Sequence, residues 1–286
     1  MALGGAAESA AAPGIELSQP LARGGAAWIQ VRELPPGSRV TGGELAGEAF
    51  PLTPQGRGLI ALDMEAETGP IPLSVRIASP RGPESVIRQT LNVPARSYQE
   101  EHLTLPEKKV ALNPKDLARS QKETAAILNA YKARGGVPGY LEGFRLPVQG
   151  RQSGFFGSRR ILNGKPKSPH NGIDVAAPQG TPVVTTAPGV VVLLGKEYFF
   201  TGNTVVVHHG DGIFSLYSHL HSVTVREGQK LAAGEALGTV GKTGRATGPH
   251  LHWGVRVREA RVDPLALPGV EPPAGAGNPN NGGAGR

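Results

Sequence analysis

The sequence predicts a mainly β protein built from two β domains that are joined by one helix. Its 286 residues include 41 glycines and 26 prolines but only 5% aromatic residues, a balance typical of many short strands and tight turns. The length exceeds that of one average domain, so two domains are expected. Short apolar runs alternate with turn sequences in both halves of the chain, which favours strands over long helices.

The first domain is expected to be a β-sandwich over residues 15–112. Runs such as AAWIQVREL and IPLSVRIAS are separated by turn sequences such as PPGS and TPQG, which is the spacing of an antiparallel sandwich. This region contains one histidine, His102, and no motif that indicates chemistry. We therefore expect a scaffold or recognition module.

A helical linker is predicted over residues 113–139. The stretch from Asn113 to Arg134 places asparagine at the N-cap and proline at the first helical position, and two glycines follow it. Apolar residues recur within it at near-helical spacing, from Leu117 to Tyr131. One helix is therefore expected between the two β domains.

The second domain is predicted over residues 140–268, and its strands are more apolar. Segments such as TPVVTTAPGVVVLLGK and NTVVVHHGDG are rich in valine, which indicates sheets buried on one or both faces. Seven of the eight histidines lie in this region. Residues 1–14 and 269–286 consist mainly of small and polar residues and are expected to be flexible tails.

Composition and charge limit the classes of function. The chain has no cysteine, which excludes disulfides, thiolate metal sites and a cysteine nucleophile but leaves the compartment open. A net charge of +7 favours a polyanionic neighbour: nucleic acid, a membrane surface or an anionic cell-wall polymer. The basic residues are scattered, so no nucleic-acid-binding stripe is predicted. No run approaches the ~20 apolar residues of a transmembrane helix, and no intact signal peptide is visible.

The segment TGPHLHWGVRV, residues 247–257, places His250 and His252 one residue apart in a predicted strand. Side chains at positions i and i+2 of a strand leave the same face, roughly 6 to 7 Å apart, so both imidazoles can reach one small object. The segment LYSHLHS adds His219 and His221 with the same alternation.

A second pair, His170 and Asp174, lies four residues apart in SPHNGIDVAAPQG. Pro169 and Gly172 argue against a helix, and in a flat strand the two side chains would lie about 13 Å apart. The pair can share one ion only if the chain bends near Gly172.

These residue types suit zinc. Histidine and carboxylate ligands bind zinc at about 2.0 to 2.2 Å, and catalytic zinc usually takes three protein ligands and keeps a position for water. His170, Asp174 and one histidine of His250 and His252 make that number. The remaining histidine would then stand beside the water position.

Taken together, these motifs resemble a known family, the lysostaphin/LytM-type (M23) zinc metallopeptidases that cut peptidoglycan cross-links. The resemblance covers about Gly150 to Val257. It is carried by SGFFGSRR, HNGIDVAAPQGTPV, GNTVVVHHGDG, LYSHL, VREGQKL and LGTVGKTGRATGPHLHWGV. It implies a C-terminal antiparallel β peptidase domain with a groove over one sheet.

The resemblance also implies roles for individual residues. His170, Asp174 and His252 hold one zinc ion per chain, and His219 and His250 flank the reacting centre. The sequence has no HExxH motif, so imidazole is expected to replace the glutamate base of many metalloproteases. We expect His250 to accept the water proton and His219 to stabilise the oxyanion or protonate the departing amine, although the two roles are interchangeable at this stage.

Weaker candidates for substrate binding surround these residues. Tyr217, two residues before His219 and therefore expected on the same strand face, is either a donor to the oxyanion or a packed core residue. Asn171 and Asn203 are either partners of substrate amides or loop-forming residues. Thr247 is placed to shape the turn before His250.

Three further histidines carry less information. His221 is either a partner of the site or a surface residue, and His208 and His209 are interpreted as residues near a turn without a role.

Three other functions were weighed against a peptidase. The strand pattern is similar to that of biotinyl carrier domains, but the Met-Lys attachment pair is missing. A serine hydrolase based on Ser218 lacks a GxSxG elbow, and neighbours in a strand face opposite ways. The alternative that stays open is a non-catalytic LytM-type scaffold that activates another cell-wall hydrolase.

The expected location is periplasmic or secreted, in association with the cell wall, and the expected partners are the peptide stems of peptidoglycan. A regulatory protein that binds the N-terminal domain is a further possible partner. The sequence leaves open the cross-link that is cleaved, D-Ala to diaminopimelate or glycine to glycine, and the role of the N-terminal domain.

Overall fold

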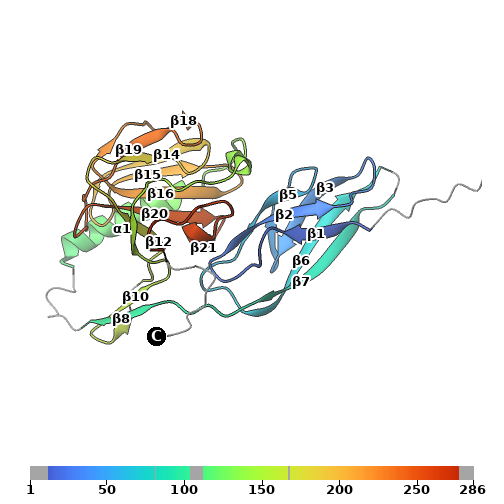
Figure 1. The fold of residues 1–286 in the computed structure, drawn as a ribbon, viewed down its shortest axis with the longest axis horizontal. Coiled ribbons are helices and arrows are strands. Elements are labelled where there is room, and N and C mark those ends of the chain that lie inside the picture. Colours follow the sequence, from blue (N-terminus) through green and yellow to red (C-terminus); the bar gives the residue numbers. More distant parts are fainter. Residues whose placement is uncertain (1–11, 81, 104–111, 167, 277–286) are drawn as a thin grey trace, which may run out of the picture. The chain divides into compact units, whose positions relative to one another are not determined.

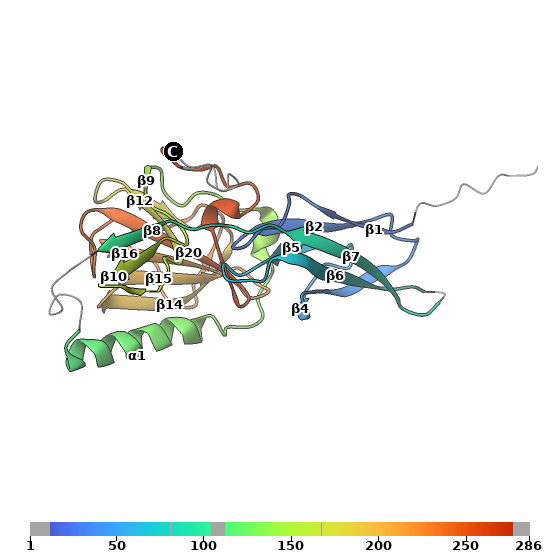
Figure 2. The ribbon, with the colours of Figure 1, turned by 90° about the horizontal axis from the view of Figure 1, so that it is seen from below.

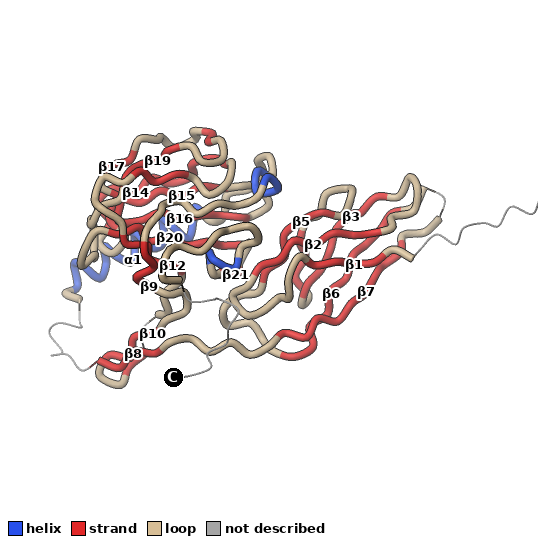
Figure 3. The backbone as a smooth tube through the Cα atoms, viewed as in Figure 1, coloured by secondary structure: helices blue, strands red, loops and turns tan. Residues whose placement is uncertain are grey.

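The structure is a computed structural model that describes residues 12–80, 82–103, 112–166 and 168–276. The outer parts of both predicted tails, residues 1–11 and 277–286, lie outside the described residues. The described chain is mainly β, as predicted, and strands dominate both of its compact units (Figures 1 and 3). No helix among the described residues has the length and apolar character needed to span a membrane.

The first unit contains two β-sheets and lies within residues 12–94. A three-stranded sheet has the order β1-β2-β5: β1 (Gly14–Leu17), β2 (Ala26–Arg32) and β5 (Arg57–Ala61). An antiparallel four-stranded sheet has the order β4-β3-β6-β7: β3 (Arg39–Leu45), β4 (Glu48–Phe50), β6 (Gly69–Ala78) and β7 (Ser85–Val93). Along β6 every second residue from Ile71 to Ile77 is buried, the period that the alternating sequence predicts. Face-to-face packing of the two sheets as a sandwich stays a prediction.

The helix α1 (Pro114–Ala130) begins as predicted. Asn113 is its N-cap, and the side-chain oxygen accepts a hydrogen bond of 2.9 Å from the Asp116 amide. The helix ends four residues before Arg134, because the amides of Lys132 and Ala133 bond to carbonyls three residues back and tighten the last turn.

Helix α1 belongs to the second unit and covers its central sheet, so it does more than link two domains (Figure 2). Ile127 and Tyr131 pack against the buried Val206 and Phe214, and the rings of Tyr131 and Phe214 meet edge to face at 5.4 Å.

The central sheet of the second unit positions the histidines. Its strand order is β18-β14-β15-β16-β20-β12-β9, with β21 added beside β20, and the pairs along it are antiparallel. These strands are β9 (Arg151–Gly154), β12 (Gly172–Ala176), β14 (Gly189–Tyr198), β15 (Gly202–His208), β16 (Ile213–Leu220), β18 (Lys230–Leu231), β20 (His250–Val257) and β21 (Ala260–Val262). Every residue of β16 is buried, so this strand is covered on both faces, whereas most residues of β14 are only half-buried. Both cases lie within the prediction of sheets buried on one or both faces.

Two smaller sheets and two short 3-10 helices complete the second unit. One sheet has the order β13-β19-β17: β13 (Pro182–Val184), β17 (Ser222–Val223) and β19 (Ala236–Thr239). The other has the order β11-β10-β8: β8 (Glu100–Leu103), β10 (Arg159–Leu162) and β11 (Lys165–Pro166). The 3-10 helices are η2 (Gly139–Glu142) and η3 (Pro264–Ala266).

The boundary of the first unit differs from the predicted one at residue 112. The first unit ends at Pro94, and residues 95–103 belong to the second because β8 pairs in parallel with β10. Two more segments from the N-terminal part of the chain, Ala22–Ala26 and Ala61–Ala66, also belong to the second unit. A prediction that divides the chain at a single residue cannot identify segments that cross between the two units in this way.

Candidate metal centre

His170 and Asp174 meet because the chain turns into β12 between them. His170 lies before the strand and Asp174 within it, and His170 Nε2 is 3.1 Å from Asp174 Oδ1. At Gly172 a Cβ atom would lie 2.4 Å from the Trp253 carbonyl oxygen and 2.9 Å from Cε1 of His252. Glycine is therefore needed at this position because β20 and the His252 ring approach its backbone closely. The short distance between His170 and Asp174 is the observation that agrees with a departure from a flat strand.

The register of β12 and β20 brings the third residue to the same place. Asp174 pairs with His252, and Ala176 pairs with His250. His252 Nδ1 lies 2.9 Å from Asp174 Oδ1, and His250 Nε2 lies 4.0 Å from the same oxygen. The two histidines of the HLH motif therefore share a face and reach one carboxylate, as predicted.

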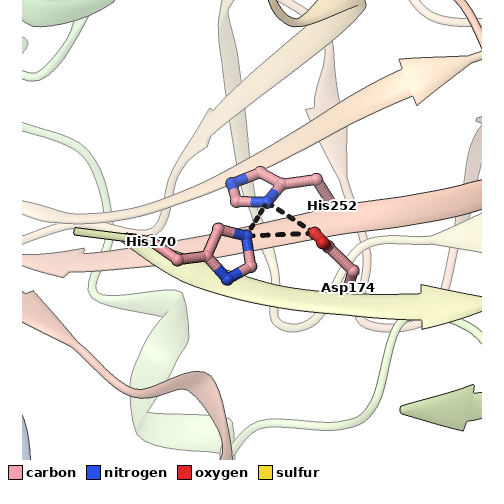
Figure 4. Close-up of side chains that lie close together, drawn as sticks. All are labelled: His170, Asp174 and His252. Atoms are coloured by element: carbon pink, nitrogen blue, oxygen red, sulfur yellow. Dashed lines mark hydrogen bonds and ion pairs between the residues drawn. The ribbon is translucent and has the colours of Figure 1, made fainter. Parts of the chain in front are cut away.

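Three potential ligand atoms converge at this point (Figure 4). His170 Nε2 and His252 Nδ1 lie 2.9 Å apart, and each is within 3.1 Å of Asp174 Oδ1. These three side chains form the one His/Cys/Asp/Glu group able to hold a metal ion among the described residues.

The chemistry of the three donors fits a cation. His170 Nδ1 lies 3.0 Å from the Phe155 carbonyl, which accepts its proton and leaves a lone pair on Nε2. That lone pair faces the Asp174 carboxylate and the His252 nitrogen. When His252 Nδ1 is deprotonated as well, all three atoms offer a lone pair to the same point. Tetrahedral ligands at about 2.0 to 2.2 Å from one ion lie roughly 3.3 to 3.6 Å apart, so the separations of 2.9 to 3.1 Å here are only slightly shorter than those of ligands that share an ion.

The protonation states agree with this arrangement. Burial raises the pKa of the Asp174 carboxyl, but hydrogen bonds and charge from His170 and His252 outweigh it, so the pKa lies below its ordinary value. Burial lowers the pKa of His252, although the Asp174 carboxylate opposes this effect. An ionised carboxylate and a neutral imidazole are the forms in which these groups bind metals.

His219 and His250 flank the three residues. Their ring centroids lie 4.6 Å apart, and the His219 ring lies 6.2 Å from that of His252. His219 Nδ1 is 2.8 Å from the Thr243 carbonyl, and His250 Nδ1 is 2.9 Å from the Gly248 carbonyl. Each ring therefore donates its Nδ1 proton to the backbone and keeps Nε2 free.

A left-handed backbone residue ends the alternation of β16. His219 has φ of +64°, and its amide donates to the Thr201 carbonyl at 2.8 Å. Side chains on either side of it no longer follow the period of two, so Tyr217 does not share its face. Burial lowers the pKa of His219 to about 4, so the ring is neutral near pH 7.

Tyr217 is a core residue, the second of the two readings that the sequence allowed. It is fully buried, and its hydroxyl accepts a hydrogen bond of 2.8 Å from the Thr186 amide. The Ser215 hydroxyl lies 2.8 Å from the same oxygen. Burial raises the pKa of Tyr217, and the hydroxyl is not available to a substrate carbonyl.

Asn203, near the start of β15, also has a structural role. The Asn203 side chain accepts from the Glu197 amide at 3.1 Å and donates to the Leu220 carbonyl at 3.1 Å. Both of its polar groups therefore bind the neighbouring strands, and substrate binding by this side chain is not supported.

Asn171 and Thr247 are exposed next to His170 and near His250 in the chain, so their contact with substrate stays a prediction. His221 is exposed too, 3.4 Å from Gln179 Nε2, and is the surface residue that the sequence favoured.

The structure contains a buried network of polar side chains that the sequence did not predict. His209 Nδ1 lies 2.8 Å from the Pro188 carbonyl and Nε2 lies 2.7 Å from the Ser215 hydroxyl, which in turn reaches Tyr217. Burial lowers the pKa of His209 to about 4. In the sequence, Ser215 indicates this network, because it is a polar residue in an otherwise apolar strand segment. His208, next to His209, stacks on Phe214 with ring centroids 4.5 Å apart.

The part of the chain that contains these residues is similar to known proteins. The model of peptidase family M23 matches residues 168–264, which include all five histidine and aspartate residues of the centre. The crystal structure of a protein assigned to peptidase M23 from Pseudomonas aeruginosa is 32% identical. It covers 87% of this chain and 95% of its own, with a TM-score of 0.63.

Two curated relatives are similar over less than half of this chain. The peptidoglycan DD-endopeptidase ShyA of Vibrio cholerae is 43% identical over 124 residues, or 42% of this chain and 29% of its own length. The DD-carboxypeptidase/endopeptidase Mpg of Neisseria meningitidis is 45% identical over 98 residues, or 34% of this chain and 22% of its own. The chain therefore spans less than a third of either relative.

Proposed function

The chain belongs to peptidase family M23, and from that membership we propose that it is a zinc-dependent endopeptidase that hydrolyses peptide cross-links of bacterial peptidoglycan. The observation that carries the proposal is the convergence of His170 Nε2, Asp174 Oδ1 and His252 Nδ1 within 3.1 Å of one another. In our proposal these atoms are the ligands of one metal ion.

Zinc is the metal that these donors favour. Two imidazoles and one carboxylate form a borderline ligand set that zinc accepts, and the chain offers no thiolate. A zinc ion bound here would lower the pKa of a water molecule from 15.7 to about 7 and polarise the scissile carbonyl.

The flanking histidines supply the proton transfers in this proposal. His250 holds its Nδ1 proton at the Gly248 carbonyl and presents a free Nε2 within 4.0 Å of Asp174, so it can accept the proton of an attacking water there. His219 is fixed in the same manner by Thr243 and lies beside His250. We assign to His219 stabilisation of the oxyanion or protonation of the departing amine. Either role requires that its free Nε2 first takes up a proton, because in the resting ring this atom carries only a lone pair.

The relatives support a peptidoglycan substrate. ShyA is named as a peptidoglycan DD-endopeptidase and Mpg as a DD-carboxypeptidase/endopeptidase, which favours a D,D-peptide bond in a cross-link over a glycine-glycine bond. The net charge of +7 would assist binding to the anionic wall polymer, in the periplasm or outside the cell.

The test combines metal content with product analysis. The wild-type chain should contain one zinc ion and release cleaved muropeptides from purified peptidoglycan, as identified by mass spectrometry. His252→Ala should lose both zinc and hydrolysis. The matched control is His221→Ala, which removes an exposed histidine of the same unit and should retain both.

A wild-type chain that binds zinc but releases no product would refute the enzymatic proposal and favour the scaffold reading.

A further inference from the structure

The loop between β9 and β10, residues 155–158, holds His170 through three hydrogen bonds. The Phe155 carbonyl lies 3.0 Å from His170 Nδ1. The Gly157 amide donates to the His170 carbonyl at 2.8 Å, and the His170 amide donates to the Ser158 carbonyl at 2.9 Å. Both the ring orientation and the backbone position of His170 therefore depend on this loop.

The ring of Tyr98 packs directly against the loop at Gly157. Gly157 has φ of +79°, and a Cβ atom there would lie 2.0 Å from Cδ1 of Tyr98. The Tyr98 ring also meets the Phe156 ring edge to face, with centroids 6.0 Å apart. The aromatic ring occupies the space that a side chain at position 157 would need.

The residues that follow Tyr98 bind the end of the same loop. The Arg159 amide donates to the Gln99 carbonyl at 2.9 Å, and from Glu100 onward β8 runs in parallel register with β10. Strand β8 therefore holds the end of the loop in place although it lies far from β10 in the sequence. Both strands lie outside residues 168–264, the segment that matches the M23 family model.

Tyr98 is itself held in place by a buried ion pair. Arg96 lies over the Tyr98 ring at 5.4 Å, and its Nη2 atom is 2.5 Å from Asp263 Oδ2. The Arg96 and Asp263 side chains are 15% and 5% exposed, so this anchor is largely shielded from solvent. The Tyr98 hydroxyl adds a longer hydrogen bond of 3.3 Å to the Met64 carbonyl.

We propose that Tyr98 is a positioning residue for the metal centre: its ring fixes loop 155–158, and the loop fixes the tautomer and orientation of His170. The inference rests on the proposed function in one respect, since it treats His170 as a zinc ligand. Metal-binding histidines depend on the group that accepts their second ring proton, and loss of such a group costs 10 to 100-fold in affinity.

The test compares three full-length variants. Tyr98→Ala removes the ring, whereas Tyr98→Phe keeps it and removes only the hydroxyl. Tyr131→Ala removes a ring of the same unit that also packs edge to face on a phenylalanine, Phe214, but has no link to loop 155–158 in the structure. Zinc affinity is measured at 25 °C by competition with a chromogenic chelator, together with the melting temperature of each variant.

We expect Tyr98→Ala to weaken zinc binding by about 10-fold or more and Tyr98→Phe to stay within about 3-fold of wild type. Tyr131→Ala should melt at a lower temperature but bind zinc as wild type does. Unchanged affinity in Tyr98→Ala would overturn the inference. An equal loss of zinc affinity in Tyr131→Ala would overturn the inference too, because it would indicate that removal of any packed aromatic ring from this unit weakens zinc binding.

A second readout needs no metal. In the zinc-free protein, histidine ¹⁵N spectra should show His170 with its proton on Nδ1 in wild type and in Tyr98→Phe, assigned by means of His170→Gln. In Tyr98→Ala the two tautomers should become mixed. A single Nδ1-H tautomer in that variant would refute the inference even if the wild-type chain proved not to bind zinc at all.

Discussion

His170 Nε2 lies 2.9 Å from His252 Nδ1 although 82 residues separate them in the chain. Two ring nitrogens at this distance need either one proton between them or one cation bound by both. His170 already places its Nδ1 proton on the Phe155 carbonyl, and the Asp174 carboxylate lies within 3.1 Å of both rings. In the proposed metal centre, one shared cation would satisfy all three groups at once.

Removal of that cation should lower stability. We expect a chelator to reduce the melting temperature and added zinc to restore it, because a ligand that binds only the folded state stabilises it. At a free concentration 100 times the dissociation constant the gain is about 2.7 kcal/mol. Scanning calorimetry measures the shift, and His252→Ala should show none. A zinc-dependent shift of wild-type size in that variant would contradict the assigned ligands.

Gly154 leaves room for the Asp174 carboxylate, and its replacement should weaken metal binding. A Cβ atom at position 154 would lie 2.3 Å from Asp174 Oδ2. We expect Gly154→Ala to displace the carboxylate and lower zinc affinity by about 10-fold or more, as chelator competition would measure. Gly248→Ala is the control, because a Cβ there meets no atom within 4 Å. Equal affinities for the two variants would argue against the steric explanation.

His250 should matter for turnover and little for metal content. Loss of a general base typically costs 10² to 10⁴-fold in rate, so His250→Gln should lose about that much in kcat on purified peptidoglycan. Its zinc content, measured by atomic absorption, should match wild type because His250 Nε2 lies 4.0 Å from Asp174 and is not among the three converging atoms. Loss of zinc from this variant would indicate that His250 is a ligand.

Strand geometry predicted two features of the candidate centre, and the family resemblance supplied the complete set of residues. The alternation of HLH placed His250 and His252 on one face, and the His170–Asp174 spacing required a bend where Gly172 now lies. The same alternation misplaced Tyr217, because the positive φ of His219 interrupts it.

Long-range pairing could not be predicted. The parallel contact of β8 with β10 joins residues about 60 apart, and no local pattern indicates it. Asn203 and His209 owe their roles to partners such as Leu220 and Pro188, which lie close only once the sheet has formed.

The buried His209 should make stability depend on pH. Its folded-state pKa of about 4 lies below the ordinary value of 6.5, so the unfolded chain binds more protons between these values. Stability is therefore complete above pH 6.5 and falls as the pH drops toward 4, by about 2 kcal/mol between pH 7 and pH 5 from this group. Urea unfolding at both pH values should show that His209→Asn loses correspondingly less than wild type. An equal loss in both proteins would contradict the assignment.

The segments that the N-terminal part of the chain contributes to the second unit should be needed for its stability. Arg261 binds Asp63 with two hydrogen bonds of 2.9 and 2.6 Å and binds Glu65 at 2.9 Å. A fragment that starts at residue 140 loses these partners together with Tyr98.

We therefore expect the fragment of residues 140–286 to melt at a lower temperature and to bind zinc more weakly than the full chain. Compared with the full chain, a fragment of residues 95–286 isolates the loss of Asp63 and Glu65. It keeps Tyr98, Arg96, β8 and helix α1, so it should recover zinc affinity more fully than thermal stability. Calorimetry and chelator competition on the three proteins measure both quantities. If the shortest fragment were as stable as the full chain and more active, the N-terminal segments would act as an inhibitory cover and not as support.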